Sequence, residues 1–203
     1  MSLIDINSSL DFDFIFDEIN LDEKTKFHCL RVGKMSHLLA QLCNFSEDII
    51  NLSHLCGRYH DIGKANEDIK ELLVLERKLS DDEKNMMRLH TNIGCDLIDF
   101  YGDKFVFENI DFSFFKAGIL NHHENFDGSG YFGLIGEKIP MWARVVTICD
   151  YLDALLEKRS YKESFTFEKS ILIMKENSHL FDPNIFNIFL KNIEKIELFY
   201  KKL

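Results

Sequence analysis

The sequence is poor in the two residues that most often interrupt helices. It has 10 Gly and 2 Pro among 203 residues, about 6% together, which is roughly half the usual share. It also lacks the sustained alternation of apolar and polar residues that is typical of half-buried strands. We therefore expect an all-α fold, a bundle of about seven or more helices, and the length suits a single domain.

Long apolar runs and an excess of basic residues are missing as well. The longest apolar runs, 72–75 and 171–174, have four residues, whereas a membrane span needs roughly 18. Lys and Arg number 24 against 34 Asp and Glu, and the net charge of -10 disfavours binding of a nucleic-acid polymer. Seven acidic residues precede the first basic residue, Lys24, whereas a signal peptide begins with positive charge. We expect neither a transmembrane helix nor export by a signal peptide.

The five cysteines contain no CxxC pair and are odd in number. They are Cys29, Cys43, Cys56, Cys95 and Cys149. This spacing predicts neither a disulfide framework nor a zinc knuckle. Buried thiols in a reducing compartment fit the pattern, so we expect a cytoplasmic protein.

Start and stop signals divide the chain into expected helices. Residues 1–22 are acidic and weakly periodic, which indicates an N-terminal extension or a short helix before a single domain at 23–203. Residues 125–139 hold four of the ten glycines and predict an irregular loop. One helix is expected to begin at Phe27, and a second runs from Ser46 to Gly63. A third follows the capping-box pattern of Ser80 and Glu83 and carries His90 in its middle. Further helices cover 112–120 and about 141–157, and two more follow, the last of which begins with Asp182 and Pro183.

Histidines and aspartates gather at the expected helix ends and beside the glycine loop. The adjacent His60 and Asp61 offer an imidazole nitrogen and a carboxylate whose two oxygens can bridge two cations. We expect two metal sites that share Asp61: His28, His60, Asp61 and Asp150 in the first, and Asp61, His90, His122 and His123 in the second. Such mixed ligands suit iron, manganese, cobalt, nickel or zinc. Taken singly, each histidine is more often a hydrogen-bonded structural group, so the grouping carries the prediction.

Three strings of residues resemble the HD-GYP domain family, a variant of the HD phosphohydrolases. They are HDIGK at 60–64, HHENFDGSGY at 122–131, and a third that starts at Ile139 and Pro140 and ends at Asp153-Ala154-Leu155. The resemblance runs from about His28 to Pro183 with the motifs in family order. It implies a metal-dependent phosphodiesterase that opens the small molecule cyclic di-GMP to pGpG and, in many members, to GMP.

The resemblance also implies roles for individual residues. It implies the same seven metal ligands, with two divalent ions, iron or manganese, as cofactors. Asp61 and Lys64 would be catalytic, in a hydrolysis by metal-activated hydroxide that requires no Ser or Cys nucleophile. The expected substrate contacts are Lys64, Tyr131, Arg144, Asp153, Arg159 and Lys162. Asp153, three residues after Asp150 on one helix face, is alternatively a support for a ligand, a proton carrier or an exposed helix carboxylate.

Three positions depart from the family pattern. Phe132 follows Tyr131 where the family has proline, so a fixed φ is lost and the loop can take another shape. Lys24 stands one turn before His28, where some members carry a Glu that holds a third metal, and we therefore expect two metals. The string RSYK at 159–162 replaces the commoner RPYK and keeps both charges.

Two alternative functions remain open from the sequence. Another hydrolase of the HD superfamily, acting on a different cyclic dinucleotide or a nucleotide, needs only His28, His60, Asp61 and Asp150. A catalytically silent module that binds a cyclic dinucleotide or a protein is the other alternative, and the intact ligand set argues against it. The 19 phenylalanines can serve a core or an interface, so a homodimer or a signalling-protein partner is left open.

Overall fold

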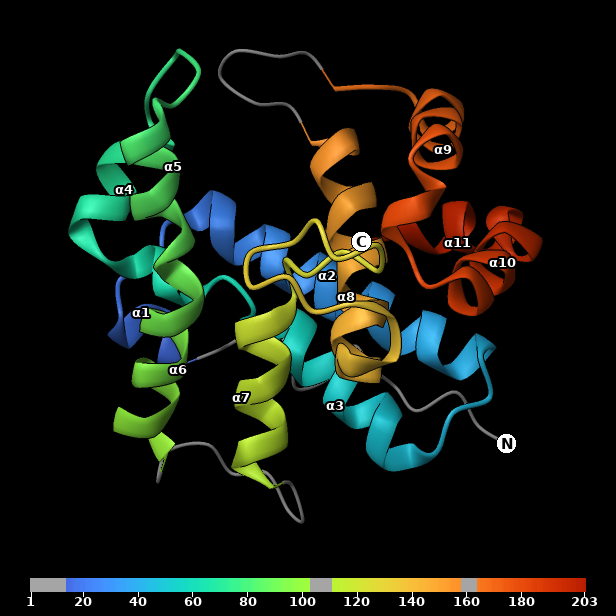
Figure 1. The fold of residues 1–203 in the computed structure, drawn as a ribbon, viewed down its shortest axis with the longest axis horizontal. Coiled ribbons are helices and arrows are strands. Elements are labelled where there is room, and N and C mark those ends of the chain that lie inside the picture. The colour runs from blue at the N-terminus through green and yellow to red at the C-terminus, as the bar shows by residue number, and fades with distance from the viewer. Residues whose placement is uncertain (1–13, 103–110, 158–163) are drawn as a thin grey trace.

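The structure is a computed structural model, and it describes residues 14–102, 111–157 and 164–203. All regular structure in these ranges is helical, which confirms the expected all-α bundle (Figure 1). None of the described helices has the length and apolar character that crossing a bilayer requires. The helices are α1 (Phe14–Glu18), α2 (Glu23–Leu42), α3 (Glu47–Tyr59), η1 (Ile62–Ala65), α4 (Glu67–Leu73), α5 (Asp81–Arg88), α6 (His90–Phe100), α7 (Phe112–Asn121), η3 (Gly136–Lys138), α8 (Met141–Leu156), α9 (Phe167–Glu176), η4 (Ser178–Leu180), α10 (Pro183–Lys191) and α11 (Ile193–Tyr200).

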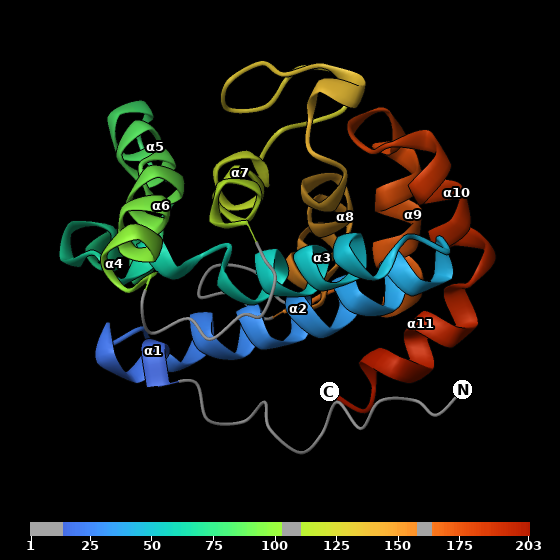
Figure 2. The same cartoon turned by 90° about the horizontal axis from the view of Figure 1, so that it is seen from below.

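Helices α2, α3 and α8 pack against one another and form the centre of the molecule. Helix α7 packs on α3 and α6, and α6 packs on η1. Helices α4 to α6 lie on one side of this centre and α9 to α11 on the other (Figure 1), while α2 and α3 run side by side (Figure 2). Ile15 and Phe16 of α1 are buried in the same core as α2. The expected division into an extension and a domain at residue 23 stays a prediction.

The predicted helix ends are confirmed where a specific capping residue marks them. Ser80 and Glu83 form the expected capping box, with the backbone N–H of Ser80 donating to Glu83 Oε2 at 2.7 Å. Asp182 caps α10, and Pro183 is its first residue. Helix α8 spans residues 141–156, one residue short of the expected range. Residues 125–139 contain only the short η3, as their glycines predict.

Three expected helices are shorter or interrupted in the structure. The helix expected from Ser46 to Gly63 ends at Tyr59, and Gly63 lies in the separate η1. The helix predicted to carry His90 in its middle breaks at Leu89, whose N–H donates to the carbonyl three residues earlier, that of Met86, at 3.0 Å. This tighter turn places His90 at the start of α6. The last predicted helix ends at Asn192, whose side chain donates to the Ile188 carbonyl at 2.9 Å and competes for it with the backbone. Three helices, rather than two, therefore follow α8 in the described residues.

Gly63 allows η1 to approach α6 very closely. A Cβ at this position would lie 1.9 Å from the carbonyl oxygen of His90 and 2.7 Å from the backbone nitrogen of Gly94. Only glycine fits such an approach of backbone to backbone. This packing brings Asp61, at the start of η1, next to His90 at the start of α6.

Candidate metal centre

The seven predicted ligands meet at one place in the fold. Their candidate ligand atoms form two groups, and within each group all the atoms lie within 4.8 Å of one another. The first group, called here the His28 group, is His28 of α2, His60 at the end of α3 and Asp150 of α8. The second, called the His90 group, is Asp61, His90 of α6, and His122 and His123 after α7. The predicted sites have the same members, except that Asp61 was expected in both sites and is grouped here with His90, His122 and His123.

Asp61 lies between the two groups and offers one oxygen to each. Its Oδ2 is 3.3 Å from His60 Nε2 and 3.6 Å from His28 Nε2. Its Oδ1 is 3.2 Å from His90 Nε2 and 3.8 Å from His122 Nε2. Oδ1 is buried and accepts no hydrogen bond. A buried carboxylate oxygen without a donor is costly, and a cation between Asp61 and the imidazoles removes that cost.

Backbone carbonyls fix the tautomers of several histidines. In three of them Nδ1 lies 2.7–2.8 Å from the carbonyl three residues earlier: His60 to Gly57, His90 to Met87 and His122 to Ile119. A carbonyl oxygen only accepts, so Nδ1 carries the proton and Nε2 keeps a lone pair in the neutral ring. The Nε2 atoms of His90 and His122 lie only 3.3 Å apart. Two lone pairs at this distance repel each other, and a cation between them removes the repulsion. The donor set therefore fits a divalent transition metal.

Burial and neighbouring charges move the pKa values of the ligands in opposite directions. Burial lowers the pKa of His123 to about 3, and His90 acts in the same direction. Burial also opposes the charged form of His28, but hydrogen bonds with Asp150 and Asp153 raise its pKa to about 9. For Asp61, burial is outweighed by Lys64 and His60, and the pKa falls well below its usual value. Asp61 is thus held as an anion.

Asp153 holds the ring of His28 through Nδ1, the nitrogen that does not face Asp61. It is 1% exposed, and its Oδ2 accepts a hydrogen bond from His28 Nδ1 at 2.7 Å. Arg31 donates to both carboxylate oxygens at 2.8 Å, and the Tyr200 hydroxyl donates to Oδ1 at 2.9 Å. Both of its oxygens are engaged, and Asp153 is not among the residues that line the cavity beside the two ligand groups. Its contacts fit the support of a ligand, rather than the substrate contact or exposed carboxylate also considered from the sequence.

The other predicted basic residues have different surroundings. Lys64 Nζ forms an ion pair with Asp61 Oδ2 at the metal centre. Arg144 donates to Asp182 Oδ2 at 2.5 Å and ties α8 to the start of α10. Arg144 is not among the residues that line the cavity beside the ligand groups, in contrast to the substrate contact expected for it. Arg159 and Lys162 lie outside the described residues.

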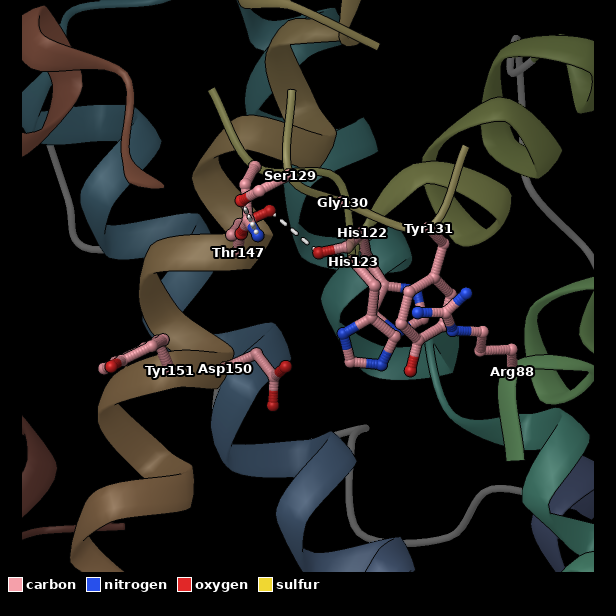
Figure 3. Close-up of a pocket in the computed structure, with 10 residues that line it drawn as sticks. Arg88, His122, His123, Ser129, Gly130, Tyr131, Thr147, Asp150 and Tyr151 are labelled. Atoms are coloured by element: carbon pink, nitrogen blue, oxygen red, sulfur yellow. Dashed lines mark hydrogen bonds between the residues drawn. The ribbon is translucent and has the colours of Figure 1, made fainter. Parts of the chain in front are cut away.

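A cavity of about 210 Å³ opens beside the two groups (Figure 3). Its lining is Arg88, His122, His123, Asn125, Ser129, Gly130, Tyr131, Thr147, Asp150 and Tyr151. The predicted Tyr131 is among them, and the centre of its ring lies 4.6 Å from that of His123. Arg88 was missed by the sequence analysis, and its guanidinium lies 5.0 Å from the centre of the Tyr131 ring. The sequence signal that could have identified Arg88 is its position two residues before the predicted ligand His90.

A second missed residue, Glu124, holds the glycine loop over the cavity. It is 1% exposed, and its two oxygens accept the backbone N–H groups of Phe132 and Leu134, each at 2.6 Å. A Cβ at Gly130 would lie 2.5 Å from Glu124 Cα, so the loop requires glycine there. Because proline has no N–H, only a residue such as Phe132 can make the first of these hydrogen bonds. The departure from the GYP signature is thus accommodated by the buried carboxylate.

Comparisons with known proteins point to one family. A family model described as an HD domain matches residues 18–185. The cyclic di-GMP phosphodiesterase response regulator RpfG of Xanthomonas campestris is 35% identical over 173 residues, which cover 82% of this chain and 43% of that protein. A cyclic di-GMP phosphodiesterase of Pseudomonas aeruginosa is 32% identical over 85% of this chain and 40% of its own length. The 3'3'-cGAMP-specific phosphodiesterase 1 of Vibrio cholerae is 29% identical, with coverage of 86% and 40%.

A solved structure shares the fold. Bd1817, described as a HDG"Y"P protein from Bdellovibrio bacteriovorus, superposes with a TM-score of 0.64 at 17% identity, over 89% of this chain and 56% of that one. The chain spans about two fifths of the length of the curated relatives above, as the coverage of 43% and 40% shows. Because the family model covers most of its length, this chain belongs to the HD domain family.

Proposed function

We propose that this chain is a metal-dependent phosphodiesterase that hydrolyses cyclic di-GMP to pGpG, with the further cleavage to GMP left open. The observation that carries the proposal is the pair of ligand groups on either side of Asp61, each facing one of its oxygens. The relatives named above as cyclic di-GMP phosphodiesterases support the substrate. The complete ligand set argues against a silent binding module.

The residues present fit two divalent ions, for which we infer iron or manganese. The His28 group with Asp61 Oδ2 would hold one ion, and the His90 group with Asp61 Oδ1 the other. When bound, such ions neutralise phosphoryl charge and lower the pKa of a coordinated water. Asp61 keeps the two groups in a fixed relation because one of its oxygens faces each of them. Neither a serine nor a cysteine nucleophile is required.

Residues beside the ions bind and orient the substrate in this proposal. Lys64 places an ammonium at Asp61, where it can contact a phosphate oxygen. Tyr131 gives the cavity an aromatic face next to His123. Arg159 and Lys162 remain predicted phosphate contacts. We also infer a cytoplasmic location, since all five cysteines are free. A homodimer or a signalling-protein partner stays a prediction.

A second candidate substrate is 3'3'-cGAMP. It is favoured by the 29% identity to a relative named as specific for that molecule, which is close to the 32% identity of the Pseudomonas relative. The two cyclic dinucleotides differ in one base and share both phosphodiesters. The assay therefore has to include both.

The test is metal counting combined with product analysis. The protein is purified without air, loaded separately with iron(II) and manganese(II), and assayed with each cyclic dinucleotide by chromatography. We expect about two ions per chain, and in Asp61→Ala a loss of turnover of about 1,000-fold or more. Asp48→Ala, at an exposed position of α3, is the matched control. Full turnover and two ions in Asp61→Ala would contradict the shared site, and a metal-loaded protein inactive on both substrates would contradict the activity.

A further inference from the structure

Arg88 lies at the side of the cavity that is formed by α5 and the glycine loop. It is the last residue of α5, directly before the turn that leads into His90. Figure 3 shows its guanidinium against Tyr131, across the cavity from Asp150. The guanidinium carbon is 5.0 Å from the centre of the Tyr131 ring, which fits a cation–π contact. The ring of Tyr131 in turn lies beside His123. One aromatic ring thus separates Arg88 from the His90 group.

The charge of Arg88 is not neutralised by the protein in the described ranges. Among the residues of these ranges that line the cavity, it is the one Lys or Arg. The structure records no ion pair for Arg88 there, whereas Lys64 is paired with Asp61 and Arg144 with Asp182. An unpaired guanidinium in a cavity is a ready partner for an anion, and its planar fork matches two phosphate oxygens.

We propose that Arg88 binds the phosphate of the cyclic dinucleotide that is not at the metal centre, with Tyr131 holding the guanidinium in place. This inference rests on the proposed function. A cyclic dinucleotide carries two phosphodiesters, and only one of them reacts at a time. The other phosphate keeps its negative charge and needs a partner away from the ions. Arg88 meets that need, because it lines the same cavity as His122, His123 and Asp150 but belongs to neither ligand group.

The proposal predicts a selective defect in Arg88→Gln. Its Kd and KM for cyclic di-GMP should rise about 10- to 100-fold, while kcat changes little, since a charge-assisted hydrogen bond is lost in the ground state and the transition state alike. Hydrolysis of bis(4-nitrophenyl) phosphate, which has a single phosphodiester, should be unchanged, and so should the number of ions per chain. Arg88→Lys keeps the charge without the fork and should show a smaller defect.

The experiment measures cyclic di-GMP affinity by calorimetry on the metal-loaded chain, beside turnover of both substrates. Lys84→Gln is the matched control, because this lysine is exposed on the same helix and pairs with Asp81. Wild-type affinity in Arg88→Gln would overturn the proposal, and so would an equal loss on bis(4-nitrophenyl) phosphate. A wild-type chain that binds cyclic di-GMP without turnover would contradict the proposed function alone, with the Kd ratio still deciding on Arg88. A chain that does not bind it would overturn both.

Discussion

The two ligand groups differ in where their negative charge comes from. The His28 group contains the carboxylate of Asp150, and a second carboxylate, Asp153, contacts the far nitrogen of His28. The His90 group has three imidazoles and the carboxylate of Asp61. Its histidines His90 and His122 are held by neutral backbone carbonyls. The fold therefore places more anionic charge around one group than around the other.

This difference has opposite effects on the same kind of side chain. Burial disfavours the charged form of both His28 and His123. The carboxylates Asp150 and Asp153 reverse the effect for His28, whose pKa rises to about 9, while that of His123 falls to about 3. A site that favours a proton's positive charge also favours that of a metal ion. We therefore expect the His28 group to hold its ion more tightly than the His90 group.

Gly63→Ala should disrupt the contact between the two groups and have the largest effect. The added Cβ would lie 1.9 Å from the His90 carbonyl oxygen, so η1 and α6 must separate. We expect the free energy of unfolding to fall by about 3 kcal/mol or more, together with loss of the ion bound by the His90 group. Denaturant titration and metal analysis measure both. Gly102→Ala is the control, since its Cβ would meet no atom of the described residues within 4 Å. Equal stability of the two variants would show that the close approach is unimportant.

Stepwise metal removal should separate the groups by affinity. With increasing chelator we expect one ion to leave before the other, with dissociation constants about 10-fold or more apart. His123→Ala should abolish the ion that leaves first, and Asp150→Ala the one that leaves last. Metal analysis after gel filtration at each chelator concentration follows the removal. Loss of both ions in one step, or the reverse assignment in the two variants, would contradict the comparison.

Asp153→Asn should weaken the His28 group alone. The amide removes the negative charge that faces His28 Nδ1, and loss of such a support typically costs 10- to 100-fold, so about that factor is expected in metal affinity. Competition against a fluorescent chelator gives the two dissociation constants. Asp99→Asn, at an exposed aspartate that pairs with Lys116, serves as the control. An equal loss in both groups would indicate a general loss of structure.

Tyr200→Phe should have the smallest effect of the series. It removes one hydroxyl that donates to Asp153 Oδ1 at 2.9 Å and leaves the ring in place. We expect a loss of about 1 kcal/mol in stability and less than about 10-fold in affinity of the His28 group. Lys201→Gln, next to it and exposed, is the control. A defect as large as that of Asp153→Asn would mean that α11, rather than Arg31, keeps Asp153 in position.

The sequence predicts residue types and local signals well. It predicts the capping box at Ser80 and the cap at Asp182, because each depends on near neighbours in the chain. The two ligand groups join residues far apart in the chain, and their prediction depended on residue types and on the family resemblance. Contacts between helices are less accessible to sequence reasoning. Helical periodicity gives the faces of a helix but not which faces meet.

Arg88, Arg144 and Asp153 illustrate that limit. All three are polar residues of helices near the predicted ligands. Arg88 lines the cavity, Arg144 pairs with Asp182, and Asp153 contacts the ligand His28. These different surroundings follow from how α5, α8 and α10 pack. The break at Leu89 likewise depends on a single turn, which the apolar spacing across it does not reveal.

The hydrogen bond from Phe132 to Glu124 makes the order of the glycine loop depend on a contact in the folded state. A proline at this position, as in the GYP signature, would restrict the unfolded chain before any contact forms, and so reduce the conformational entropy lost on folding. Phe132 provides no such restriction, and its contact with Glu124 exists only in the folded loop. In this chain the ordered loop therefore depends on the buried Glu124 carboxylate, which Phe132 and Leu134 contact through their backbone N–H groups.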